Sequence, residues 1–493
     1  MTYNRPGVYI TERLLPSPIG ETAAANAAGA VIGYFSQGPS EVTLVTSWYD
    51  FTKQFGSYSN AYPATFGVGQ FFANGGTELY VRRVLGTGAD VAGAEPDFGT
   101  IAAKNSGTDG NNLFIQLVAT GVSHYFNVEV YKTQGLSDVL VEVFNNVVFN
   151  DRTSNDFVEN VANPISKYIV LTVDPAFATD PSTAAVIPLS GGVDGAAPTT
   201  VQVTGALADF EGITRPLVFF APEVYTIGVS TDGQVINSAI LDWAAGHNGF
   251  AVFDLPAGTT PSSAIVDAGY IVADSTIANS GHGAVYYPSY YIQDPVARSS
   301  SALRLVGPAG AMAGLYLATD RAVGPFKAAA GINARLNGAL ALEIALTSQN
   351  LDDLNSATTA VNSISNLPGV GIVAMGARTL LNDGTSNKYI SMRRSLIHIT
   401  KELEDLTQFA LFENNDSSLW SRINTTITVF LNDYRNKGGL AGSSPDQSFF
   451  IKVDEENNTA DSIARGEVNI QVGVALQYPA EFVVITLSQK TAI

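Results

Sequence analysis

Apolar runs long enough for buried strands alternate with helix-length segments in two separated parts of the chain. Near the start, residues 31–35 and 79–85 read as strands, and the helical turns between them end in the breaker Asn74-Gly75-Gly76. The same alternation returns over residues 216–287. This is the pattern of an α/β layer, so residues 26–89 and 201–370 are predicted to form one α/β middle domain.

A different pattern separates these two parts. Residues 86–110 are rich in Gly and Ala, and residues 113–118 then alternate as a strand would. A turn-rich stretch at residues 190–195 ends the region. Further strand candidates lie between them at residues 127–131, 139–144 and 168–173. We therefore predict a mainly β insertion over residues 90–200.

After residue 370 the pattern predicts a compact α+β domain, residues 371–493, that ends in an apolar strand. Its helix candidates are residues 400–411 and 419–434, and its strand candidates are residues 371–375, 448–453, 467–477 and 482–487. Chain termini usually fray, and a long unpaired apolar edge invites aggregation. The last strand therefore needs a partner, and a second copy of this chain is one candidate.

The composition is that of a folded, sheet-rich protein. Of 493 residues, 46% are hydrophobic and only 14% are charged, which indicates that part of the surface is buried in an assembly. No apolar run approaches the roughly 20 residues that span a bilayer, and the first residues lack the apolar core of a signal peptide. Synthesis and folding in a cytoplasm are therefore predicted. The absence of cysteine excludes disulfides and cysteine-based metal or redox sites.

The formal charge of −19 is concentrated in the middle of the chain. Residues 1–85 have no net charge. Residues 86–205 carry four basic and thirteen acidic side chains, and residues 371–493 carry eleven basic and fourteen acidic side chains. An acidic, sparsely charged surface repels phosphate backbones, so no direct nucleic-acid binding is predicted. The nearly neutral ends are better suited to close contact with other protein.

Motifs of catalytic chemistry are missing from the sequence. It contains no phosphate-binding loop, no His-Glu-x-x-His zinc pair and no Gly-x-Ser-x-Gly nucleophile elbow. The adjacent Asp352 and Asp353 are interpreted as the solvated end of a helix, and the four histidines lie in different segments. A carbohydrate-active hydrolase would need a pair of acidic residues in a cleft, and no such pair stands out. We predict no enzyme activity, no catalytic residue, no cofactor and no metal.

Short motifs follow one another in order across almost the whole chain. They are Arg5-Pro6-Gly7-Val8-Tyr9-Ile10-Thr11-Glu12, Val31-Ile32-Gly33, Phe55-Gly56, Phe71-Phe72-Ala73-Asn74-Gly75-Gly76, Leu79-Tyr80-Val81-Arg82-Arg83-Val84, Gly324-Pro325-Phe326-Lys327-Ala328, Gly376-Ala377-Arg378-Thr379-Leu380, Tyr389-Ile390 with Arg393-Arg394, Phe412-Glu413-Asn414-Asn415 and Tyr478-Pro479-Ala480-Glu481-Phe482. Together these blocks resemble the sheath protein of contractile phage tails, and their common order makes the resemblance stronger than any single block does.

The resemblance implies a tail-sheath-like, multidomain fold of α/β and α+β type with extended terminal arms. An N-terminal arm, residues 1–25, would pack with the C-terminal domain, and both arms would add strands to sheets of neighbouring subunits. The expected arm strands are Val8, Tyr9, Ile10, Phe482, Val483, Val484 and Ile485. The alternative is that both arms are ordinary edge strands within one subunit. Beside them, Gly7, Gly466 and Gly473 are candidate hinges, or else turn or bulge residues.

The resemblance also implies a function. Such subunits stack as six-fold rings into a helical sleeve around a tail tube and contract to drive the tube through the host cell envelope. The implied partners are other copies, the tube protein, and baseplate and tail terminator proteins, with no insertion into a membrane. The implied location is the virion, after synthesis in the host cytoplasm. The sheath of a bacterial contractile injection particle, such as a tail-like bacteriocin, is the alternative.

In such a sleeve the C-terminal domain faces inward and the acidic insertion is expected to project outward. The charged residues Lys401, Glu402, Glu404 and Asp405 lie on one predicted helix. They are candidates for screened, readily broken contacts with the tube, or else form a solvated helix face.

Overall fold

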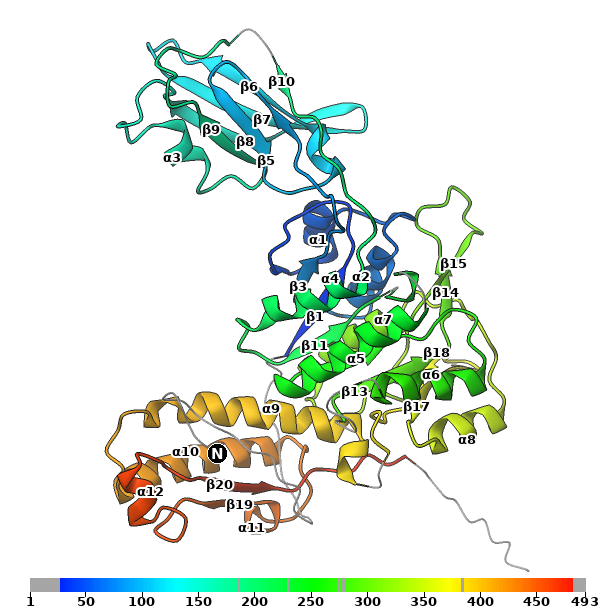
Figure 1. The fold of residues 1–493 in the computed structure, drawn as a ribbon. Coiled ribbons are helices and arrows are strands. Elements are labelled where there is room, and N and C mark those ends of the chain that lie inside the picture. The colour runs from blue at the N-terminus through cyan, green and yellow to red at the C-terminus, as the bar shows by residue number, and fades with distance from the viewer. Residues whose placement is uncertain are drawn as a thin grey trace, which may run out of the picture.

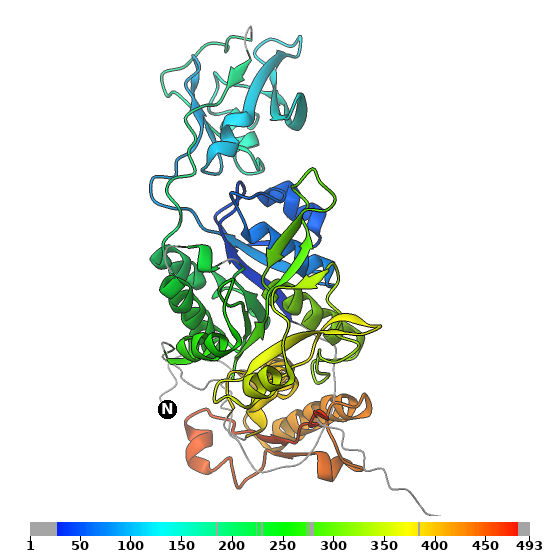
Figure 2. The same ribbon diagram turned by 90° about the vertical axis from the view of Figure 1, so that its right-hand side faces the viewer.

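The computed structural model describes residues 27–183, 186–222, 224–227, 230–273, 275, 281–382 and 385–481. These residues form three regions in a row, with a β-rich insertion at one end, an α/β region in the middle and a C-terminal region at the other end (Figure 1). A view from the side shows the same order (Figure 2). The mixed α/β and α+β multidomain fold predicted from the sequence is confirmed.

The middle region is built on an eight-stranded sheet whose six central strands are parallel. In spatial order the strands are β18 (Gly371–Ala374), β17 (Val361–Leu367), β13 (Gly283–Tyr287), β12 (Phe250–Phe253), β11 (Leu217–Phe220), β1 (Ala28–Gly33), β3 (Leu79–Arg83) and β2 (Thr43–Val45). Every residue of β1, β11, β12 and β13 is buried. Parallel strands need cover on both faces, which explains their continuous apolar sequences.

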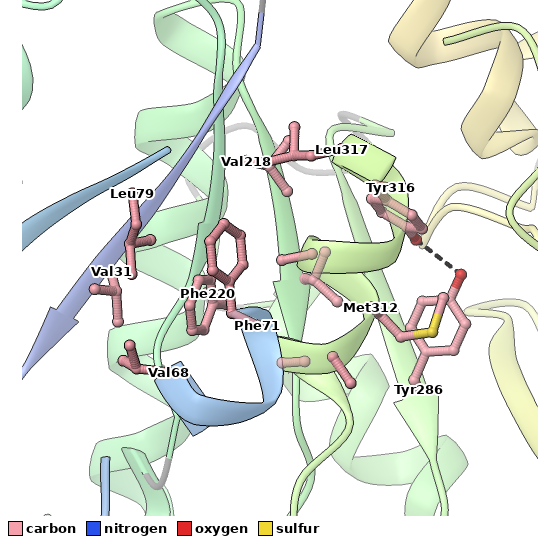
Figure 3. Close-up of a cluster of buried hydrophobic side chains, with 14 of the residues drawn as sticks. Val31, Val68, Phe71, Leu79, Val218, Phe220, Tyr286, Met312, Tyr316 and Leu317 are labelled. Atoms are coloured by element: carbon pink, nitrogen blue, oxygen red, sulfur yellow. Dashed lines mark hydrogen bonds between the residues drawn. The ribbon is translucent and has the colours of Figure 1, made fainter. Parts of the chain in front are cut away.

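Helices supply this cover on each face of the sheet. One face packs on α4 (Thr200–Gly205), α5 (Ser230–Gly246), α6 (Pro261–Ala273) and α8 (Ser348–Ser356), and the other on α1 (Trp48–Phe55), α2 (Ala64–Ala73) and α7 (Ala309–Ala322). Figure 3 shows the second face, where Phe71 stacks on Phe220 with 5.4 Å between ring centroids. In the same cluster, the hydroxyl groups of Tyr286 and Tyr316 are 2.7 Å apart.

Glycines let α2 and α7 approach closely. A Cβ atom at Gly310 would lie 2.2 Å from the carbonyl oxygen of Gly67, and one at Gly314 would lie 2.2 Å from that of Phe71. Beside these helices, a small antiparallel sheet is formed by β14 (Tyr290–Gln293), β15 (Leu303–Val306) and β16 (Ala341–Leu342).

The insertion has two antiparallel sheets around its own core. One contains β10 (Ile187–Pro188), β6 (Leu113–Ala119), β7 (Phe126–Gln134) and β8 (Ser137–Val147), and the other contains β4 (Gly93–Ala94), β5 (Gly99–Ala103) and β9 (Ile169–Val173). The short helix α3 (Val158–Ala162) packs beside β9. Twenty buried apolar residues, including Phe98, Phe149 and Phe157, fill the space between these elements. The strand candidates at residues 127–131, 139–144 and 168–173 correspond to β7, β8 and β9.

The C-terminal region consists of helices packed on a two-stranded sheet. Its elements are α9 (Ile390–Thr407), α10 (Ser417–Asn436), α11 (Pro445–Ser448), β19 (Phe449–Lys452), α12 (Ala460–Ala464) and β20 (Gln471–Val474). Helix α9 begins ten residues before the predicted start at residue 400, because its first turns bury Arg393 and Arg394, whose charges hide the apolar pattern. The predicted strand 467–477 is shortened to β20.

One predicted strand belongs to a different region. Residues 371–375 were assigned to the C-terminal domain, but β18 pairs with β17 at the edge of the eight-stranded sheet. A turn closed by a hydrogen bond from Val370 N to Leu367 O joins the two strands, so the local hairpin holds β18 in the middle region. The chain leaves this sheet only after Leu380, which is part of the core of the middle region.

Candidate assembly interface

The sheet β19–β20 differs from the other sheets in being only two strands wide. Its register pairs Phe449 with Val474 and Lys452 with Gln471, and in the described part of the chain neither strand has a second strand neighbour. One side packs on the cluster of α9 and α10 that includes Trp420 and Tyr434. Among the described residues, therefore, no strand pairs with the backbone N–H and C=O groups along the two outer edges.

Gly473, one of the predicted hinge candidates, lies within this sheet. It is paired with Phe450, and a Cβ atom at Gly473 would lie 2.0 Å from the Phe450 ring. The glycine thus makes room for the ring, which is 46% exposed on the outer face. Gly466 adopts φ of 75° directly after the last turn of α12, a position that favours glycine. Gly7 lies outside the described residues.

After β20 the chain crosses from the C-terminal region to the middle region. Leu476 bridges Leu440, the amide of Gln477 donates to the carbonyl oxygen of Gly439, and the ring of Tyr478 packs edge-on against Tyr389. We call residues 475–481 the strap.

The strap ends in an ion pair with the middle region. The guanidinium of Arg378 donates from Nε and Nη2 to the two carboxylate oxygens of Glu481, each at 2.7 Å. The two residues belong to separate motif blocks of the sequence analysis, 103 positions apart. Sequence reasoning did not pair them, because nothing in their spacing shows which of the chain's many charges meet.

The helix α9 joins the two regions through a buried ion pair. Arg394 Nη1 donates to Asp320 Oδ1 of α7 at 2.9 Å, a second bond joins Arg394 Nη2 to Asp320 Oδ2, and the guanidinium also lies 4.8 Å above the Tyr316 ring. One turn later, burial lowers the pKa of His398 to about 4, with Arg394 and Lys437 adding to the effect. The imidazole is therefore neutral at pH 7 and packs on Tyr434.

The four predicted tube-facing residues lie together on the last turns of α9. Lys401 contacts Asp405 at 2.5 Å and Glu404 at 3.6 Å, while Glu402 lies 4.0 Å from His398. Burial alone would lower the pKa of Lys401, but its two acidic partners outweigh burial and raise it. Glu404 and Asp405 are nearly half exposed. The cluster is thus an internally paired, partly exposed charged surface.

The insertion is held to the middle region by buried charge. Arg83 of β3 is fully buried and donates to the carbonyl oxygens of Phe35, Gly38 and Ser106, while its Nη2 lies 3.8 Å from Asp194. Asp194 also accepts hydrogen bonds from Thr108 and from the Tyr62 hydroxyl. Lys132 of β7 adds a second link, to Gln37 and Asp109. These contacts join both connecting segments of the insertion to the middle sheet.

The predicted arm-strand residues Val8, Tyr9, Ile10, Phe482, Val483, Val484 and Ile485 lie outside the described residues. Within the described residues, no group of three or more acidic or histidine side chains is arranged to hold a metal ion. None of the described helices is both long and apolar enough to cross a bilayer.

The C-terminal region matches a known protein family. The model of the phage tail sheath C-terminal domain family matches residues 382–490. A tail sheath protein of Vibrio phage KVP40 is 28% identical over 165 residues, which are 33% of this chain and 23% of that protein. A tail sheath protein of Salmonella phage ViI is 23% identical over 339 residues, 67% of this chain and 49% of that protein. The aligned part thus spans less than half the length of either relative.

Solved structures show the same fold over more of the chain. The helical sheath of the anti-feeding prophage in its contracted state covers 99% of this chain and 100% of its own, with 21% identity and a TM-score of 0.59. A sheath tail protein from Listeria innocua covers 88% of this chain and 90% of its own, with 14% identity and a TM-score of 0.63. The resemblance to tail sheath proteins predicted from the motifs is confirmed by the family model and the curated relatives, and the solved structures confirm the fold.

Proposed function

We propose that this chain is a structural subunit of a contractile tail sheath. Copies of it polymerise as stacked six-fold rings around a tail tube, and contraction of the sleeve drives the tube through the host cell envelope. The observation that carries the proposal is the open-edged sheet β19–β20, which lies inside the region matched by the sheath C-terminal domain. An added strand would satisfy many backbone groups at once and fix the register between subunits.

The arms are the proposed donors of such strands. Residues Val8 to Ile10 and Phe482 to Ile485 are apolar and β-branched or aromatic, as added strands require. A donor segment and an acceptor edge on different parts of one chain make a heterologous contact, which propagates instead of closing into a dimer. The partners are accordingly other copies of the chain, the tube protein, and baseplate and tail terminator proteins.

Contraction in this proposal is a change of packing and needs no catalytic site. Subunit bodies rotate and move outward while the paired arms keep neighbours connected. The charged cluster Lys401, Glu402, Glu404 and Asp405 is the proposed tube-facing surface, because partly exposed ion pairs are screened by salt and readily exchanged. The acidic insertion projects outward, where its charge opposes unwanted association.

Such a sheath can belong to a phage tail or to a bacterial injection particle. The curated relatives belong to phages, whereas the anti-feeding prophage sheath has the same fold over nearly the whole chain. We favour a phage tail, in which the sheath is part of the virion and is made in the host cytoplasm. Electron microscopy of the native particles separates the two cases, because only a phage carries a genome-filled head.

Negative-stain electron microscopy of the purified full chain, beside a variant that ends at Glu481, tests the proposal. The full chain is expected to form long hollow sleeves, and the variant isolated particles with an unchanged melting temperature. The equal melting temperature is the control that the shortened subunit is folded. Compact monomers from both proteins, across a range of salt and protein concentration, would contradict the proposal.

A further inference from the structure

The ion pair between Arg378 and Glu481 has a geometry that fixes direction as well as distance. Two parallel N–H···O bonds of 2.7 Å join the planar guanidinium to the planar carboxylate. A paired arrangement of this kind holds both planes in one orientation, which a single contact with a lysine could not do. The side chains are 11% and 23% exposed, so water screens the pair only partly.

Arg378 itself is rigidly placed on the middle region. The side-chain amide of Asn362, a buried residue of β17, accepts from Arg378 N at 2.7 Å and donates to Arg378 O at 2.7 Å. A third guanidinium nitrogen, Nη1, donates to the carbonyl oxygen of Asn355 in the last turn of α8 at 2.7 Å. The arginine is thus positioned independently of Glu481.

Glu481, by contrast, lies at the end of a segment with few other polar contacts. Between described residues, the last backbone hydrogen bond along the chain is that from Gln477 N to Gly439 O. Beyond it, Tyr478 contacts Tyr389 through its ring, and Pro479 has no N–H to donate. Among the contacts between described residues, the carboxylate of Glu481 is therefore the polar anchor of residues 478–481.

We propose that Arg378 is a positioning residue for the C-terminal arm. Its pairing with Glu481 attaches the base of the arm to the edge of the middle sheet, although the strand that precedes the strap belongs to the C-terminal region. The arm consequently starts from a fixed point and in a fixed direction, and it moves with the middle region when subunits rotate. This inference rests on the proposed function for its role in assembly, but the attachment can be measured on a single subunit.

Conservative variants separate the two side chains. Glu481→Gln keeps the size but removes the charge and one of the two acceptor oxygens, and Arg378→Lys keeps the charge but removes the paired geometry. The matched control is Glu467→Gln, because Glu467 forms the same bidentate pair with Arg465 inside the C-terminal region and does not join two regions. Melting temperatures of all three variants report whether the folded core is retained.

Hydrogen exchange followed by mass spectrometry gives the direct measurement. In the unassembled fraction of the full chain, the amide of Gln477, whose bond to the carbonyl oxygen of Gly439 is the protected one nearest to Glu481, is expected to exchange about fivefold to tenfold faster in Glu481→Gln and Arg378→Lys. The control Glu467→Gln leaves the exchange of this amide at the level of the unmodified chain. Unchanged exchange of the Gln477 amide in both variants would overturn the proposal.

Electron microscopy of the same proteins keeps this inference distinct from the proposed function. Shorter or irregular sleeves from Glu481→Gln, beside normal sleeves from Glu467→Gln, support both. Normal sleeves from every variant would show that the chain assembles and that the ion pair does not position its arm. No sleeves from the unmodified chain would count against the proposed function alone, since the exchange measurement does not depend on assembly.

Discussion

The eight-stranded sheet and the sheet β19–β20 differ in how much of their surface and edges the subunit itself covers. The eight-stranded sheet has helices on both faces, antiparallel strands at both edges, and four central strands in which every residue is buried. The sheet β19–β20 has two strands, helices on one side, and mostly half-buried residues. A two-stranded sheet is marginal by itself and gains stability from further strands.

This difference indicates that the large sheet stabilises the single subunit, whereas the small sheet contributes to association between subunits. The large sheet holds the subunit together whether or not other copies are present, because its apolar surface is already covered. In the part of the chain that the structure describes, the small sheet has two outer edges without a strand partner and an exposed aromatic ring, Phe450. Substitutions in the two sheets should therefore affect different measurements.

The largest expected effect comes from truncating a ring in the large sheet. Phe220 is fully buried and stacks on Phe71, so Phe220→Ala should lower the free energy of unfolding by about 3–5 kcal/mol through lost burial and the cavity left behind. In the small sheet, Phe450→Ala should cost about 1 kcal/mol or less, since nearly half of that ring is exposed. Urea denaturation of unassembled subunits measures both values.

Sleeve formation should show the opposite order. Phe450→Ala should reduce the length or number of sleeves, whereas Phe220→Ala sleeves should be normal at temperatures where the subunit remains folded. Equal losses of unfolding free energy from the two substitutions would mean that Phe450 stabilises the single subunit as much as Phe220 does, which contradicts the comparison.

Glycines offer a smaller contrast between the same two regions. Gly310→Ala places a methyl group 2.2 Å from the carbonyl oxygen of Gly67, so α7 must move away from α2, at a cost of about 1–3 kcal/mol. Gly473→Ala places its methyl group 2.0 Å from the Phe450 ring, which can turn toward solvent. Thermal unfolding should therefore show a clear decrease for Gly310→Ala and little change for Gly473→Ala. A larger decrease for Gly473→Ala would show that the Phe450 ring is held rigidly.

The sequence predicted the large sheet better than the contacts between regions. Continuous apolar strands such as β11 and β12 are recognisable locally, because burial on both faces leaves a direct pattern. The start of α9 was placed too late, since Arg394 is charged and becomes a core residue only through Asp320 on another helix. The pairing of Arg378 with Glu481 likewise depends on tertiary structure. Of the candidate site, the sequence places the four charged residues of α9 together on one predicted helix, and their tube-facing role stays a prediction. The outer edges of β19–β20 are recognised only from the sheet topology.

The smallest expected effect concerns the insertion, whose contacts with the middle region lie within one subunit, as those of the large sheet do. Burial raises the pKa of Asp194, but hydrogen bonds from Thr108 and Tyr62 and the charge of Arg83 outweigh burial and lower it. A carboxylate with a lowered pKa stabilises the folded state above its unfolded pKa of about 3.9. This stabilisation is lost as the pH falls through the lower, folded-state value.

Asp194→Asn should accordingly destabilise the attachment of the insertion by about 1 kcal/mol at pH 7 and by progressively less below pH 4. Hydrogen exchange of residues 105–112, which contact Asp194 through Thr108, reports this attachment at each pH. Asp138→Asn is the matched control, because Asp138 bonds only to Thr133 among its described partners, at an exposed position of β8 far along the sequence from Arg83. If Asp194→Asn and Asp138→Asn give the same exchange of residues 105–112 at every pH, Asp194 does not stabilise the attachment. The insertion would then be joined to the middle region by the covalent chain alone.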